Sequence, residues 1–111
     1  MANDCIFCKI VEKEIGSDIV YEDDKVVVFK DINPKKPIHL LIVPRVHRES
    51  IMDLDEQDSS LISHIVFVAQ EIARKYEVES KKDGFRLLCN YGEKGGQEVD
   101  HLHFHFLASS K

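Results

Sequence analysis

The most constraining feature of this sequence is a stretch near its end, residues 101–107, in which histidine alternates three times with a large apolar residue. Strict alternation of this kind is typical of a strand with one face on the core. The apolar members, expected in the core, are Leu102, Phe104 and Phe106. The histidines, expected together on the opposite face, are His101, His103 and His105. Because valine, isoleucine or threonine would form a better strand, three imidazoles in a row indicate a functional site rather than a solvated strand face.

The length and charge of the chain narrow the class of protein. A chain of 111 residues can bury a core of its own, and we expect one domain, residues 1–111. The 15 basic and 20 acidic residues give a net charge of −5 without a run of lysines, which argues against nucleic acid as a partner. Neither a membrane span nor a secretory signal is recognisable. We therefore expect a cytoplasmic protein without a membrane partner.

Hydrophobic periodicity predicts an α+β fold with a five-stranded antiparallel sheet, one long amphipathic helix and a short N-terminal helix. The strands are expected at residues 19–22, 25–30, 38–43, 85–90 and 101–107. The long helix follows Asp53 and carries an apolar stripe that includes Leu61 and Ile65. Asp53 and Glu56 are spaced as an acidic capping box for this helix.

Cys5 and Cys8 form a C-x-x-C pair that can chelate one metal ion from a single turn of chain. The two further ligands would be distant histidines, and His47 or His101 could meet the pair only if the sheet brings them together. Two alternatives remain open, a thioredoxin-like redox motif and a pair of inert buried thiols. His39 is interpreted as a satisfied core or surface histidine.

A glycine-rich segment immediately precedes the histidine stretch. Asn90 is followed by Gly95, Gly96, Gln97, Glu98 and Val99. Glycines let backbone amides approach an anion closely, and a nest of N–H groups beside imidazoles is suited to phosphate. We expect a phosphate site here.

These residues resemble a known family. Residues 101–107 resemble the signature of the histidine triad (HIT) family, and the Gly-Gly-Gln-Glu-Val segment resembles the approach to it in the Hint branch of that family. The resemblance extends over nearly the whole chain, through residues 4–10, 29–34 and 44–47. It implies a HIT-like fold of the bacterial, zinc-containing type.

The resemblance also implies a reaction. The central histidine, His103, would attack the α-phosphorus of a nucleoside monophosphate ester or amide, and water would then release the mononucleotide from a covalent nucleotidyl-histidine. His105 would contact the phosphate. Glu98 stands where many relatives have a serine that assists the leaving group. A carboxyl group beside a phosphate has a raised pKa and could supply the proton instead.

Further sites follow from the resemblance. The implied ligands of a closed, structural zinc site are Cys5, Cys8, His47 and His101. The implied nucleotide-binding residues are Phe7, Ile10, Phe29, Asp31, Ile32, Asn90, Gly96, Gln97, His103 and His105. On the residues alone, Phe7, Ile10 and Phe29 could equally be core, and Asp31 could cap the turn at Asn33.

The resulting expectation is a homodimeric hydrolase of purine nucleoside phosphoramidates or related AMP conjugates. A dinucleoside polyphosphate hydrolase would share the same nucleophile. A non-catalytic, nucleotide-binding regulatory module and a zinc-stapled structural protein are the alternatives from other classes. Turnover of an amide but not of a dinucleoside polyphosphate separates the two hydrolases. Mononucleotide binding without turnover would indicate the regulatory module, and the structural protein would bind no nucleotide.

Overall fold

The computed structural model describes residues 5–109, so Asp4 of the N-terminal motif lies outside the described residues. The elements are α1 (Ile6–Val11), β1 (Ile19–Glu22), β2 (Val26–Lys30), β3 (Ile38–Pro44), two short 3-10 helices η1 (Ile51–Asp53) and η2 (Glu56–Asp58), α2 (Ser59–Lys75), β4 (Arg86–Leu88) and β5 (Phe104–Ala108). The strands form one antiparallel sheet in the order β1-β2-β3-β5-β4. The predicted α+β fold is confirmed.

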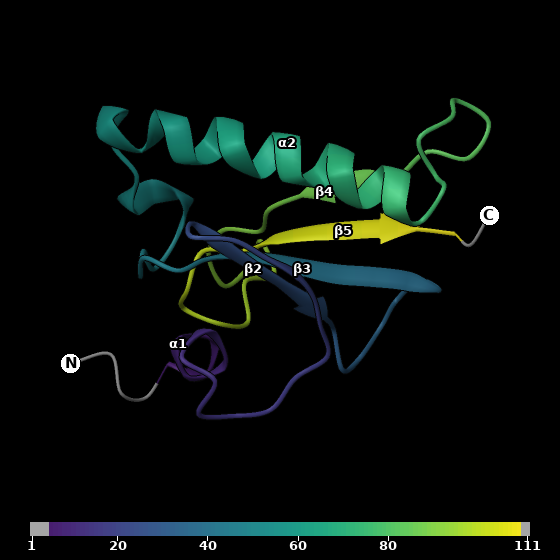
Figure 1. The fold of residues 1–111 in the computed structure, drawn as a ribbon. Helices are drawn as coiled ribbons and strands as arrows, with labels where there is room; N and C mark the ends of the chain where they lie inside the picture. The colour runs from purple at the N-terminus through teal and green to yellow at the C-terminus, as the bar shows by residue number, and fades with distance from the viewer. Residues whose placement is uncertain (1–4, 110–111) are drawn as a thin grey trace.

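The sheet has a helix on each face, with α2 above it and α1 below it in Figure 1. Alternating strand residues supply the two cores, because successive side chains of a strand point to opposite faces. Leu40 and Phe106 pack against the buried stripe of α2, whereas Leu41 belongs to a cluster with Phe7 and Ile10 of α1. Leu41 is the register partner of His105, which therefore lies on the α1 face.

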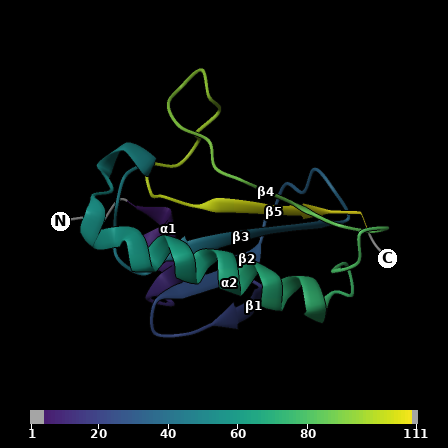
Figure 2. The same cartoon turned by 90° about the horizontal axis from the view of Figure 1, so that it is seen from above.

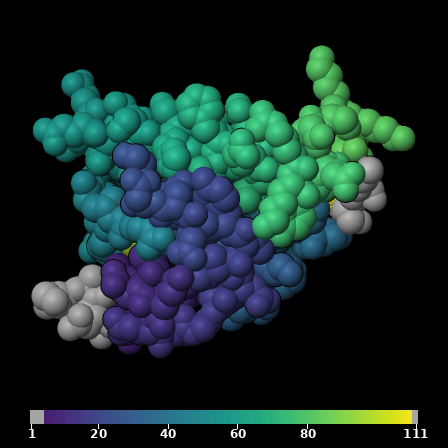
Figure 3. Space-filling model, viewed as in Figure 1, coloured from purple at the N-terminus to yellow at the C-terminus, as the bar shows by residue number. Residues whose placement is uncertain are grey.

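Helix α2 lies over the sheet, roughly in the direction of the strands (Figure 2). Two contacts hold one flank of the helix to the β1 side. The His64 Nε2 atom lies 2.7 Å from Asp23 Oδ2, and Lys75 Nζ donates to the Val20 carbonyl at 2.6 Å. In the space-filling view of Figure 3, the β1 region lies between the N-terminal segment and α2. Among residues 5–109, no helix is both long and apolar enough to cross a membrane.

The predicted capping box at Asp53 and Glu56 is wrong. A capping box forms two residues later, between Asp55 and Asp58 in η2, and α2 begins after it. Asp53 lies in η1, where its carboxylate accepts a hydrogen bond from Ser50 Oγ at 2.8 Å. Two short 3-10 turns therefore separate β3 from α2.

The histidine strand is shorter than predicted, because β5 begins at Phe104 rather than His101. The Leu102 N–H donates to the Arg48 carbonyl at 2.6 Å, which draws this part of the chain away from the sheet. Leu102 and Phe106 are buried as predicted, whereas Phe104 is only half-buried. The same folding buries His101 completely and leaves His103 only 6% exposed.

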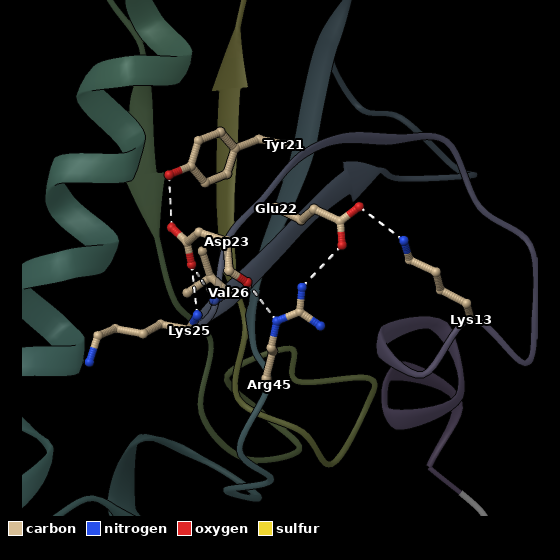
Figure 4. Close-up of polar contacts among 7 residues, drawn as sticks. All are labelled: Lys13, Tyr21, Glu22, Asp23, Lys25, Val26 and Arg45. Atoms are coloured by element: carbon tan, nitrogen blue, oxygen red, sulfur yellow. Dashed lines mark hydrogen bonds and ion pairs between the residues drawn. The ribbon is translucent and has the colours of Figure 1, made fainter.

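The β1–β2 turn holds the segment that follows β3 (Figure 4). Arg45 Nε donates to the Asp23 carbonyl at 2.6 Å, and Arg45 Nη2 lies 3.0 Å from Glu22 Oε1. Glu22 also pairs with Lys13, which follows α1, at 3.1 Å. This network fixes the backbone that leads to His47.

Candidate active site and metal centre

Four predicted metal ligands come together at the N-terminal end of α1. Cys5 is the N-cap of α1 and Cys8 lies in its first turn, His47 follows β3, and His101 precedes β5. Their ligand atoms all lie within 4.8 Å of one another. Residues separated by up to 96 positions thus form one Cys2His2 cluster.

The spacing of these atoms suits a tetrahedral metal ion. Cys5 Sγ and Cys8 Sγ lie 3.3 and 3.6 Å from His101 Nδ1, and the Nδ1 atoms of His47 and His101 are 3.1 Å apart. Bond lengths of about 2.3 Å to sulfur and about 2.0 Å to nitrogen place tetrahedral ligands about 3.3 to 3.8 Å apart. The distances within the cluster are within a few tenths of an ångström of those that a bound zinc ion would require.

Hydrogen bonding prepares His101 for this role. Its Nε2 lies 2.8 Å from the Pro44 carbonyl, which can only accept, so Nε2 carries the proton and Nδ1 keeps its lone pair toward the cysteines. Burial lowers the pKa of His101 to about 4, which keeps the ring neutral. Burial also raises the pKa of the Cys8 thiol to about 11, with Cys5 adding to the shift. A bound cation would reverse that shift, because metal ligation deprotonates a thiol.

The backbone of His101 orients His103. His103 Nδ1 lies 2.7 Å from the His101 carbonyl, so Nδ1 donates and Nε2 is left with the lone pair. The ring of Phe7 packs edge-on against His103 at 5.0 Å between centroids. His103 therefore combines a fixed tautomer with a fixed ring position, as a nucleophilic imidazole requires.

A second hydrogen-bond chain fixes His105. The Lys35 N–H donates to His39 Nδ1 at 3.0 Å, so a neutral His39 carries its proton on Nε2. That Nε2 lies 2.9 Å from His105 Nδ1, which leaves His105 with an N–H donor at its own Nε2. Burial lowers the pKa of His105 to about 4, and the charges of His103 and His39 add to the shift. A neutral donor, His105, thus stands beside the lone pair of His103.

His39 is the functional residue that the sequence analysis missed. It is buried and satisfied, as predicted, but its partners are His105 and the Asp31 carboxylate, which lies 3.3 Å from His39 Nε2. Burial lowers its pKa. The signal was a histidine at an otherwise apolar strand position, but it could be used only with the knowledge that β3 pairs with β5.

Asp31, His39 and His105 also lie close enough together to hold a cation. Coordination through His39 Nε2 would require a proton on Nδ1, where the Lys35 N–H already points. The hydrogen bond from the Lys35 N–H to His39 Nδ1 therefore favours the hydrogen-bonded arrangement over a second metal site.

The histidines open into a cavity of ≈ 340 Å³. Its lining includes predicted nucleotide-binding residues, namely Phe7, Ile10, Phe29, Asp31, Ile32, His103 and His105, together with Glu98. Phe7 and Phe29 are buried and pack edge to face at 5.5 Å, whereas Ile32 is 88% exposed at the rim. Asp31 serves two purposes, because its Oδ1 accepts from the Asn33 N–H at 2.8 Å while the residue also lines the cavity.

The other predicted binding residues lie in the β4–β5 connection and do not line this cavity. The Asn90 side chain donates to the Gly95 carbonyl at 2.8 Å, and a Cβ at Gly95 would overlap the Tyr91 carbonyl. Gly96 has φ +91°, a conformation that favours glycine. The side-chain amide of Gln97 forms hydrogen bonds to backbone groups that precede and follow it in the sequence. These residues shape the loop that carries Glu98.

Comparisons with known proteins agree with this geometry. A family model described as scavenger mRNA decapping enzyme C-terminal binding matches residues 4–111. Protein HitA of Neisseria gonorrhoeae is 44% identical over 107 residues, which cover 96% of this chain and 97% of that protein. The purine nucleoside phosphoramidase of Escherichia coli K12 is 41% identical over 107 residues, covering 96% and 88%.

Solved structures give the same result. A histidine triad protein from Clostridium difficile superposes with a TM-score of 0.92 at 47% identity, covering 98% of this chain and 93% of that one. A HIT family hydrolase from Legionella pneumophila has a TM-score of 0.89 at 41% identity, covering 96% and 94%. The matched geometry and the extent of these likenesses place the chain in the histidine triad (HIT) family, as a hydrolase of that family.

Proposed function

We propose that the protein hydrolyses purine nucleoside phosphoramidates or related AMP conjugates through a covalent nucleotidyl-histidine at His103. The proposal rests mainly on the hydrogen bond between His103 Nδ1 and the His101 carbonyl. This bond leaves the lone pair of His103 on Nε2, and His103 lines the cavity. The phosphoramidase activity named for the Escherichia coli relative supports this choice of substrate.

The reaction has two steps. His103 Nε2 attacks the α-phosphorus, a P–N bond to the ring forms, and the bond from phosphorus to the leaving amine breaks as the amine gains a proton. Water then attacks the same phosphorus and gives a proton back to the carboxylate that protonated the amine, the P–N bond to His103 breaks, and AMP is released. His105 Nε2–H is the donor for the negative oxygens in both steps. Its low pKa keeps it neutral, so it stabilises charge as a dipole.

The cavity suits the rest of the nucleotide. The base would lie among Phe7, Ile10, Phe29 and Ile32, whose apolar surfaces favour a planar ring. The Asp31 carboxylate lines the cavity, and the remaining lone pairs of its oxygens would accept from ribose hydroxyl groups. Asn90 and Gly96 would act nearer the phosphate, through the shape of the loop that they hold.

Glu98 is the proposed acid for the leaving group, since it is an exposed carboxyl that lines the cavity with His103. Replacing it with glutamine removes the proton but keeps the size. We expect Glu98→Gln to slow release of a basic amine in single-turnover measurements, with little effect on an acidic leaving group. Equal rates for wild type and variant with both leaving groups would remove Glu98 from the mechanism.

The Cys2His2 cluster is proposed to hold Zn²⁺. Four protein ligands fill a tetrahedral site and leave no open position, so the ion would supply a structural crosslink. Cys5, Cys8, His47 and His101 would hold it. The three free thiols, including Cys89, suit a reducing compartment, and we propose the cytoplasm.

A homodimer is proposed from the β4 side of the molecule. Strand β4 is at the sheet edge, with one side unpaired. His64 and Lys75 fasten one flank of α2 to the β1 side, so helical spacing turns the opposite flank, with Ile62 and the 44% exposed Val66, toward β4. A second copy would cover this flank and edge. Sedimentation of wild type as a dimer and of Val66→Lys as a monomer is expected, whereas a monomeric wild type would refute the dimer.

The proposed function is tested with a fluorogenic adenosine phosphoramidate. We expect turnover by the wild type and a loss of at least about 10³-fold in His103→Ala, with the metal content unchanged. His64→Ala is the matched control, because His64 lies on α2 away from the cavity, and it should retain activity. Turnover of a dinucleoside polyphosphate but not of the amide would indicate the other hydrolase. Nucleotide binding without any turnover would indicate a regulatory module.

A further inference from the structure

The side chain of Gln97 forms hydrogen bonds to the protein through both its amide nitrogen and its oxygen. Its Nε2 donates to the Glu49 carbonyl at 2.7 Å and to the Val99 carbonyl at 3.0 Å, and its Oε1 accepts from the Gly92 N–H at 3.3 Å. A primary amide has two N–H donors and one carbonyl oxygen with two lone pairs. Both donors already have partners in the protein, so a hydrogen bond from the Gln97 side chain to a phosphate oxygen would have to displace one of them.

Two of the three partners lie in the β4–β5 connection with Gln97 itself, and the third, Glu49, lies in the segment after β3. The Gly92 carbonyl also accepts from the Gln97 N–H at 3.0 Å, so the two residues bond in both directions. Val99 lies beyond them and lines the cavity with Glu98 and His103. Glu49 is two residues after His47 of the Cys2His2 cluster.

A second bond joins the same segments. The Leu102 N–H donates to the Arg48 carbonyl, so residues 48–49 receive hydrogen bonds from both Gln97 and Leu102. The chain between these two donors contains Glu98 and Val99, which form a wall of the cavity. Val99 also packs against the core cluster on the α1 face, so the Gln97 bonds hold the end of this wall that precedes Glu98.

We propose that Gln97 is a positioning residue, whose amide fixes the Glu98–Val99 wall of the cavity to the segment after His47, and not a residue that binds the nucleotide through its side chain. This role replaces the one expected from the sequence. The effect of Gln97 on catalysis rests on the proposed function, whereas its effect on the position of the loop does not. The carbonyls of Glu49 and Val99 both require a donor, and the single side-chain amide of Gln97 supplies both.

The test uses Gln97→Met, which keeps the approximate length of the side chain and adds no charge near a phosphate. Gln57→Met is the control, because the Gln57 side chain is exposed in η2. Amide hydrogen exchange is measured over residues 90–101 without nucleotide, together with kcat, KM and metal content. We expect exchange in this loop to rise about tenfold or more in Gln97→Met only, since loss of its ties lowers the free energy of local opening.

The kinetic expectation is a fall in kcat/KM of about tenfold with the metal retained, because the cavity wall is no longer held in place. Gln97→Glu provides a second variant, which still accepts from Gly92 but cannot donate to Glu49 and Val99, and it should raise exchange as well. Unchanged exchange in both variants would overturn the proposal, even if activity fell, and would point to a direct contact with the nucleotide. If the wild type hydrolyses no phosphoramidate, the proposed function fails, while the exchange experiment still decides the role of Gln97.

Discussion

Two backbone groups, one carbonyl and one amide, set the tautomers of His103 and His105. The His101 carbonyl holds the proton of His103 on Nδ1, and the Lys35 N–H, acting through His39, puts the proton of His105 on Nε2. The sequence identified the row of histidines, but it could not identify their tautomers. The tautomer of His105 depends on His39, 66 residues before it, and on a backbone amide in the β2–β3 loop, whereas that of His103 depends on the His101 carbonyl.

The pKa of His105 gives a prediction at this scale. An unfolded histidine has a pKa near 6.5, and the folded value is about 4, so between these values the unfolded chain binds more protons and stability falls as the pH falls. From pH 7 to pH 5, the wild type should lose about 1 kcal/mol more unfolding free energy than His105→Asn, after allowance for partial exposure. Denaturant titrations at the two pH values measure this difference. Equal losses of unfolding free energy in the two proteins would show that the pKa of His105 is not lowered in the folded state.

At the scale of elements, the β1–β2 turn is the fastening point of α2. One Asp23 carboxylate accepts from the Lys25 and Val26 N–H groups, at 2.8 and 2.9 Å, and from Tyr21 Oη at 2.7 Å, and it lies beside His64 of α2. These hydrogen bonds hold its pKa at about 2 despite burial. The contribution of Asp23 is therefore complete above pH 3.8 and is lost as the pH falls toward 2.

Asp23→Ala should accordingly destabilise the protein by about 2 to 3 kcal/mol at pH 7, since several donors lose their acceptor together. Asp24→Ala is the matched control, because the neighbouring Asp24 is exposed, and it should change stability by less than about 0.5 kcal/mol. The comparison requires only urea titrations. A similar small effect for both variants would mean that the turn does not fasten α2.

Hydrophobic periodicity predicted the helices and strands well wherever the buried side chains recur with the period of the helix or strand. The apolar stripe of α2 and the strands β1 to β3 lie where the sequence indicated, within one residue for the strands. The prediction failed at the start of β5, because His101 and His103 are buried, His101 in the Cys2His2 cluster and His103 against Phe7. A two-residue period cannot represent such contacts. It also overextended β4, since the Asn90 side chain turns into the loop and bonds to Gly95.

At the scale of the molecule, the Cys2His2 cluster joins the N-terminal segment, the end of β3 and the start of β5. The C-x-x-C pair marked half of the cluster in the sequence. Residues alone left His47 and His101 as candidates among six histidines, because their approach depends on the pairing of β3 with β5. The family resemblance supplied the choice, and the distances between the ligand atoms agree with it.

Removal of the proposed zinc should disturb both stability and the proposed nucleophile, since the ring of His101 would be a ligand and its carbonyl orients His103. We expect a strong chelator to lower the melting temperature by about 5 °C or more, because a ligand that binds only the folded state stabilises it. Stoichiometric Zn²⁺ should restore the melting temperature. A preparation that contains no metal as purified and melts identically with and without Zn²⁺ would contradict the proposed site.

The central claim, a covalent nucleotide on His103, is tested most directly by rapid quenching at neutral to alkaline pH, where a phosphoramidate survives, followed by intact-mass and peptide-mass measurement. The wild type mixed with an adenosine phosphoramidate should carry one nucleotidyl group per chain, located on His103, and His103→Ala should carry none. Turnover without any adduct, or an adduct located on His105, would contradict the account.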